Sequence, residues 1–264
     1  MLLRRSLILA TCLLATACAD SKFPYEPQFA STDDVSVAAL PTPPAADSKK
    51  FKNELDQIVA LQKKLTQKEK NTIAEEGPVV PEMIVLPVLG KNYSEAKYPA
   101  LYTLLRHAGS DSWRISDAAK DYWKAPRPFH VDSRIQPYAE PLKSYGYPSG
   151  HTTTGHVWAG VLSDIFPAKK AAFTKRAGQI AQHRVSGGLH FPYDVAGGKT
   201  LAATIVAKLK TNPDYQRELA AAKAEVKSPA VKSQKMAGGG VAACDRYVRS
   251  VNGGTTNVMQ AGGC

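Results

Sequence analysis

Apolar residues recur at three- and four-residue steps along most of this chain, and this spacing constrains the fold more than any other feature. The pattern begins with Phe51, Leu55, Ile58, Leu61 and Leu65. Such spacing places one apolar face of a helix against a core, and it predicts further helices over residues 98–107, 112–123, 152–165, 171–187 and 193–209. Strand-type alternation is nearly absent, so the sequence predicts an all-α fold, a compact helical bundle.

The flanking segments lack this periodicity. Residues 18–47 are rich in Pro, Ser, Ala and Asp and predict a flexible leader. Residues 79–89 are apolar but contain two prolines, which predicts a loop or short turn. A helical domain with the candidate catalytic residues is expected over residues 48–226, and a Gly-rich C-terminal tail over residues 227–264.

Residues 1–17 have the layout of a secretory signal peptide. Arg4 and Arg5 precede an apolar run over residues 7–17 that is too short to span a bilayer as a mature helix. Small residues at the end of the run fit cleavage after Ala17, and the same stretch resembles a degenerate lipoprotein box in which Cys18 would be lipidated. The sequence therefore predicts a periplasmic or secreted protein, either soluble or lipid-anchored to the membrane.

An oxidising compartment would also decide the state of the remaining cysteines. Cys244 and Cys264 form an even pair that could close the tail through a disulfide, and two free thiols are the alternative. Neither cysteine has metal-ligand spacing, and no metal site is expected.

The formal net charge of +11 suits an anionic partner. Nucleic acid is not expected, because the lysines are scattered rather than clustered with aromatic residues. A solvated basic surface explains most of the excess.

The spacing of the residues predicts that three positively charged side chains point towards the core. Arg184 continues the apolar stripe of residues 171–187, Lys120 lies on the apolar face of residues 112–123, and Arg127 follows between two prolines. Close unit charges repel by about 4 kcal/mol at an effective dielectric near ~20, so the three would need an anion among them. The alternative is a separate acidic partner for each cation.

Two further segments carry the remaining candidates. Ser149 and Gly150 form a turn at the expected start of a helix, where backbone N–H groups can hold an oxyanion and Ser149 can cap the helix or donate to a phosphate oxygen. His151 would lie at the mouth of such a site as an acid. Asp194 follows His190 by four residues and can hold one imidazole nitrogen as N–H, leaving the other free to attack. A capped helix with an exposed His and a structural His–Asp pair are the alternatives.

In their order along the chain these segments resemble the tripartite signature of the type-2 phosphatidic-acid-phosphatase superfamily, which also includes vanadium haloperoxidases. The residues before Arg127, together with the export signal and no further stretch of membrane-spanning length, are most similar to bacterial class A non-specific acid phosphatases. The resemblance implies a helical bundle of the acid phosphatase/vanadium haloperoxidase type and a metal-independent acid phosphatase with no cofactor.

The resemblance also implies the roles of the site residues. His190 would form a phosphohistidine, Asp194 would orient it, and His151 would protonate the leaving alkoxide. The phosphate would be bound by Lys120, Arg127, Ser149, Gly150 and Arg184. One departure concerns His183, because the family usually has Ser immediately before the Arg of the third segment.

Three other functions fit the same residues. The pocket of a vanadium-dependent haloperoxidase would hold vanadate in place of phosphate, and a lipid phosphate phosphatase would gain access to its substrate through a lipid on Cys18. A non-enzymatic anion-binding surface protein is the third alternative. The expected partners are small phosphomonoesters, with the membrane reached only through Cys18 and homo-oligomerisation left open.

Overall fold

The computed structural model describes residues 26–140 and 143–228. Within these residues the chain is helical without a strand, which confirms the all-α prediction. The helices are α1 (Lys49–Gln62), α2 (Gln67–Glu75), α3 (Glu82–Leu89), α4 (Pro99–Trp123), α5 (Pro128–Val131), α6 (Gly150–Ile165), α7 (Lys170–Ser186), α8 (Pro192–Leu209) and α9 (Pro213–Lys227), with short 3-10 turns at Val37–Ala39 and Pro167–Lys169. The predicted signal peptide, Cys18, Cys244, Cys264 and the Gly-rich tail lie outside the described residues.

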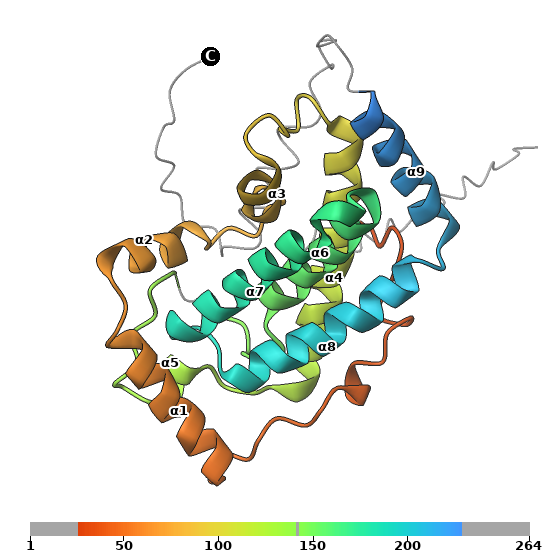
Figure 1. Ribbon diagram of the computed structural model, residues 1–264. Coiled ribbons are helices and arrows are strands. Elements are labelled where there is room, and N and C mark those ends of the chain that lie inside the picture. Colours follow the sequence, from red (N-terminus) through yellow and green to blue (C-terminus); the bar gives the residue numbers. More distant parts are fainter. Residues whose placement is uncertain (1–25, 141–142, 229–264) are drawn as a thin grey trace, which may run out of the picture.

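Helix α6 lies at the centre of the bundle and packs against α4, α7 and α8 (Figure 1). Its apolar residues are almost wholly buried, and the indole N–H of Trp158 donates to the carbonyl oxygen of Leu105 on α4 at 2.7 Å. A Cβ atom on Gly109 would lie 2.8 Å from the Trp158 ring, so glycine allows α4 and α6 to approach closely here. The packing places the first residues of α6 inside the molecule.

The structure corrects the prediction of a loop or short turn over residues 79–89, because Glu82–Leu89 form helix α3. Pro87 removes the N–H that would bond to the carbonyl oxygen of Met83 four residues earlier. That carbonyl accepts a hydrogen bond from Nε of Arg176 on α7 at 2.8 Å. A tertiary hydrogen bond therefore replaces the helical one that the Met83 carbonyl loses because Pro87 has no N–H.

The two helices predicted over residues 98–107 and 112–123 are a single helix, α4. The polar residues between them are buried and make local or tertiary hydrogen bonds. Ser112 donates to the carbonyl oxygen of Gly109 at 2.8 Å, and Asp111 serves as an acceptor for a distant segment of the chain. Polar character in this stretch therefore marks buried contacts and not a helix end.

Residues 26–47 pack along the bundle, although a flexible leader was predicted over residues 18–47. Phe29, Ala30, Val35 and Leu40 are buried in the common core. In Figure 1 this red-to-orange segment runs beside α8 towards α1. We refer to residues 26–47 as the N-terminal strap.

The carboxylate of Asp111 holds the beginning of the strap. It accepts backbone hydrogen bonds from Gln28 at 3.0 Å, Phe29 at 2.7 Å and Ala30 at 3.0 Å. Further along, the Tyr147 hydroxyl donates to the carbonyl oxygen of Pro41 at 2.6 Å. Since Tyr147 lies two residues before Ser149, the strap supports the segment that enters α6.

None of the helices in residues 26–140 and 143–228 is long and apolar enough to cross a membrane.

The substitution Asp111→Ala is expected to destabilise the protein by about 3 kcal/mol or more, because it leaves three backbone N–H groups at the core without their acceptor. Urea unfolding followed by circular dichroism measures the loss. The matched control is Asp121→Ala, which removes an exposed carboxylate from the same helix. Equal unfolding midpoints for the two variants would contradict the role assigned to Asp111.

Candidate active site

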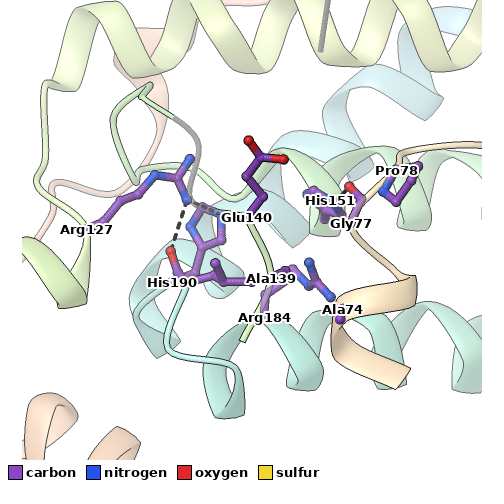
Figure 2. Close-up of a pocket in the computed structure, with 10 residues that line it drawn as sticks. Ala74, Gly77, Pro78, Arg127, Ala139, Glu140, His151, Arg184 and His190 are labelled. Atoms are coloured by element: carbon purple, nitrogen blue, oxygen red, sulfur yellow. Dashed lines mark hydrogen bonds between the residues drawn. The ribbon is translucent and has the colours of Figure 1, made fainter. Parts of the chain in front are cut away.

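Four of the sequence-predicted residues line one cavity of about 190 Å³. These residues are Arg127, His151, Arg184 and His190. Figure 2 shows Arg127 beside the ring of His190, with His151 and Gly77 on the other side of the cavity in this view. The start of α6, the end of α7 and the start of α8 meet here, so segments distant in the sequence contribute to one site.

His190 is buried and fixed by the first turn of α8. Its Nδ1 donates to Oδ2 of Asp194 at 3.1 Å, and the backbone N–H of Phe191 donates to the same oxygen at 2.9 Å. Asp194 therefore stabilises the start of the helix and the orientation of the ring together. Because Nδ1 carries the proton, Nε2 of the neutral ring keeps its lone pair.

The guanidinium of Arg127 donates to this lone pair, with Nη1 at 3.1 Å from Nε2 of His190. Its other hydrogen bonds go to the carbonyl oxygens of Leu189 at 3.0 Å and Ser144 at 2.8 Å and to the Ser144 hydroxyl at 3.2 Å. Pro128 begins α5 immediately after Arg127 and restricts the backbone there. Burial lowers the pKa of Arg127 to about 10, so the group stays charged near neutral pH.

Arg184 enters from the last turn of α7 and is also buried. Its Nη2 donates to the carbonyl oxygen of Ile73 at 2.9 Å and lies 3.5 Å from a carboxylate oxygen of Glu76. Its Nε has no hydrogen-bond partner within the described part of the chain. A buried N–H of this kind is costly unless a ligand accepts from it.

The end of α7 and the start of α8 have the local structure that the sequence predicts. Gly187 follows the last residue of α7, Gly188 has a φ of 74°, and Pro192 occupies the first turn of α8. Positive φ is readily adopted only by glycine, which allows the chain to reverse between the two helices. This reversal brings Arg184 and His190 to the same cavity.

Lys120 and Gly150 lie next to each other beside the cavity. Lys120 is buried on α4, with Nζ 5.4 Å from the centre of a Trp113 ring. A Cβ atom on Gly150 would lie 3.2 Å from that Nζ and 3.0 Å from the Trp113 ring. Glycine at the first position of α6 therefore leaves room for the ammonium group.

Ser149 is the N-cap residue of α6. Its Oγ accepts from the backbone N–H of Thr152 at 3.4 Å and from the Thr152 hydroxyl at 3.0 Å. Its backbone N–H donates to the carbonyl oxygen of Asp194 at 3.0 Å. Ser149 thus joins the starts of α6 and α8, and its hydroxyl has the capping geometry that the sequence offered as one of two roles.

His151 is held from the opposite wall of the cavity. Its Nε2 lies 2.9 Å from the carbonyl oxygen of Gly77, which can only accept. Nε2 therefore carries a proton, and a second proton on the ring would be placed on Nδ1. Its ring also makes an edge-to-face contact with Trp113 at 5.9 Å between centroids.

Burial dominates the electrostatics of this site. It lowers the pKa of His151 and of His190 well below the ordinary value, with Arg184 the next cause for His151 and Arg127 for His190. Burial raises the pKa of Asp194 to about 8, against the opposing hydrogen bond from the Phe191 N–H. The cavity therefore resists further positive charge and is suited to an anion.

Sequence reasoning missed several side chains around the cavity. Glu76 is buried at the end of α2 and contacts Arg176, His183 and Arg184. Glu140 lines the cavity wall and is labelled in Figure 2. The only sequence signal for the Glu76 cluster is the presence of His183 where the family usually has Ser. Among the described residues no group of three His, Cys, Asp or Glu side chains is arranged to hold a metal ion.

The fold and the cavity together define a helical protein with a buried cavity lined by two arginines and two histidines. Residues 100–217 match the PAP2 superfamily. A non-specific acid phosphatase of Providencia stuartii is 30% identical over 200 residues, which cover 72% of this chain and 80% of that relative. An acid phosphatase of Zymomonas mobilis is 32% identical over 143 residues, covering 52% of this chain and 53% of the relative.

The chain therefore belongs to the PAP2 superfamily, and it is an enzyme of the acid phosphatase class within it. This confirms the resemblance drawn from the three sequence segments. The crystal structure of a bacterial vanadium-dependent iodoperoxidase is similar with a TM-score of 0.50 and 21% identity, over 66% of this chain and 54% of that chain. That similarity supports the helical fold.

Sulfate is expected to bind more tightly as the pH falls from about 7 to about 5, by up to about tenfold per pH unit for each proton taken up. A bound dianion favours the charged imidazoles, so it raises the pKa values of His151 and His190 from their lowered values. Isothermal titration calorimetry at several pH values measures the slope. The variant His151→Gln should reduce the slope, and the exposed His130→Gln should not. A wild-type affinity that is constant over this range would contradict the electrostatic account.

Proposed function

We propose that this enzyme hydrolyses phosphate monoesters through a phosphohistidine on Nε2 of His190 and needs no metal ion. The observation that carries the proposal is that Nε2 is the unprotonated nitrogen of the neutral ring and accepts a hydrogen bond from the buried Arg127 guanidinium. A phosphate oxygen that accepts from Arg127 instead would leave the Nε2 lone pair available to attack phosphorus. The small-molecule substrates follow from the acid phosphatases that the chain resembles. The cavity size is also suited to a phosphate group rather than to a large ligand.

In the proposed binding step, protein cations neutralise the phosphate. Arg127 and Arg184 bind non-bridging oxygens from two sides, and Lys120 approaches past Gly150. The backbone N–H groups of Gly150 and His151 at the start of α6 add further donors. Positive charge fixed in a buried site stabilises the transition state without reorganisation, as metal ions do in other phosphatases.

In the proposed chemical step, Nε2 of His190 attacks phosphorus as the ester P–O bond breaks. His151 gives a proton to the leaving alkoxide, and the alcohol departs. Asp194 accepts from Nδ1 of the phosphorylated imidazolium, whose positive charge favours ionised Asp194 against the effect of burial. A water molecule then loses a proton to His151 and attacks phosphorus, the P–N bond breaks, and inorganic phosphate and His190 are regenerated.

An acidic working range follows from the same groups. His151 must carry its second proton in the substrate complex, whereas His190 must be neutral to attack. Since burial and Arg184 lower the pKa of His151, the protonated fraction and the rate decrease as the pH rises. The bound phosphate partly offsets this shift.

We also propose that the enzyme acts outside the cytoplasm. Support comes from Arg4, Arg5 and the apolar run over residues 7–17, which have the layout of an export signal. Cleavage after Ala17 and lipidation of Cys18 are both consistent with this layout.

Rapid-quench labelling with a radiolabelled phosphomonoester tests the nucleophile. Wild-type enzyme is expected to accumulate an acid-labile phosphoenzyme, and His190→Ala to accumulate none, with activity reduced by at least about 10³-fold. Chelator should leave the wild-type reaction unchanged. The control His130→Ala removes an exposed imidazole and should retain labelling. An acid-labile phosphoenzyme in His190→Ala would rule out His190 as the nucleophile.

The dependence on the leaving group tests the acid. His151→Ala is expected to reduce kcat by about 10²- to 10⁴-fold on alkyl phosphates, whose alkoxides need a proton. The loss on nitrophenyl phosphate should be much smaller, because nitrophenolate leaves without one. Steady-state kinetics on both substrates measures the difference, and equal losses would contradict the assignment of His151.

A further inference from the structure

The turn at Glu76 and Gly77, which follows α2, contacts two of the proposed catalytic groups at once. The carboxylate of Glu76 lies 3.5 Å from Nη2 of Arg184, and the carbonyl oxygen of Gly77 lies 2.9 Å from Nε2 of His151. The two contacts come from adjacent residues of one segment. The segment therefore spans from the anion-binding side of the cavity to the proton-transferring side.

Glu76 is firmly held against α7. Its Oε1 accepts from Nη2 of Arg176 at 2.7 Å, and its Oε2 lies 2.8 Å from Nδ1 of His183. The residue is only 4% exposed. Burial alone would raise the pKa of Glu76, but the hydrogen bond and charge of His183 and the contacts of Arg176 outweigh it and lower the pKa. Glu76 is therefore a carboxylate in the working enzyme.

This carboxylate leaves the ligand-binding edge of Arg184 available. Glu76 is not among the residues that line the cavity, and it shares Nη2 of Arg184 with the carbonyl oxygen of Ile73. The buried Nε of Arg184 is the atom that lacks a hydrogen-bond partner within residues 26–140 and 143–228. Nη2 therefore fixes the guanidinium, while Arg184 still lines the cavity.

We propose that the Glu76–Gly77 turn positions Arg184 for phosphate binding and His151 for proton transfer, with Glu76 as the positioning residue. The inference rests on the proposed function for its link to catalysis. It also gives a role to His183, since the imidazole in place of the usual Ser supplies a further contact that holds Glu76. Displacement of this turn would disturb both groups together.

The test uses the full chain and compares Glu76→Gln with Glu75→Gln, which changes the neighbouring exposed glutamate. Glu76→Gln is expected to weaken the binding of inorganic phosphate by about 10- to 100-fold, because the guanidinium loses its charged partner. Glu75→Gln should bind like wild type. Isothermal titration calorimetry measures both affinities without any need for turnover. Equal affinities for the two variants would overturn the proposal.

Two kinetic and energetic readouts separate positioning from general structural support. In the Arg184→Met background, Glu76→Gln should have almost no further effect on phosphate affinity, because the group through which it acts is gone. On the Arg184-containing enzyme, Glu76→Gln should reduce kcat more on an alkyl phosphate than on nitrophenyl phosphate, since His151 is also displaced. The proposal would be contradicted if Glu76→Gln weakened phosphate binding as much in the Arg184→Met background as in the wild type. It would also be contradicted if Glu76→Gln reduced kcat equally on the alkyl phosphate and on nitrophenyl phosphate.

Glu76→Asp covers the case in which Glu76→Gln does not fold. This variant keeps the charge but shortens the side chain, and a several-fold loss of phosphate affinity is expected. Wild-type affinity in a folded Glu76→Asp enzyme would overturn the inference. Failure of the proposed function can be distinguished from failure of this inference. A wild-type chain that binds phosphate but hydrolyses no phosphomonoester would contradict the proposed hydrolysis, whereas the effect of Glu76 on phosphate binding could still be measured.

Discussion

The burial of several cations around a neutral imidazole is the constraint on which this structure depends. Charges of one sign that are removed from water repel one another unless partners are supplied. In this protein backbone carbonyl oxygens supply much of that support, from Ser144 and Leu189 for Arg127 and from Ile73 for Arg184. Carbonyl dipoles orient a guanidinium without neutralising it, so the positive potential remains available to a ligand.

Helix ends provide the geometry that this charge arrangement needs. The cavity lies where α6 and α8 begin and α7 ends, and Ser149 and Asp194 connect the two beginnings through one backbone hydrogen bond. Helix ends expose unpaired backbone groups that must be satisfied. Asp194, which accepts from the Phe191 N–H at the start of α8, also holds the ring of His190 in place, so helix capping and active-site geometry depend on each other.

Local pattern in the sequence was sufficient for most of the core helices, and periodicity places Arg184 and Lys120 on buried faces. Local pattern was insufficient where a contact with a residue distant in the sequence determines the local structure. Helix α3 forms despite Pro87 because Arg176 reaches the carbonyl oxygen of Met83, and the strap is ordered by Asp111. Nothing in the spacing of residues near Glu76 indicates that its carboxylate contacts Arg176 and His183 of α7, 100 and 107 residues later.

Arg176 has a consequence for how this enzyme can vary. Its guanidinium bonds both to Glu76 beside the cavity and to the proline-interrupted helix behind it. A homologue that lost this arginine would need a new partner for a buried acid and a replacement donor for a helix carbonyl in the same step. Substitution of Arg176 is therefore limited by two separate contacts, although its side chain is not among those that line the cavity.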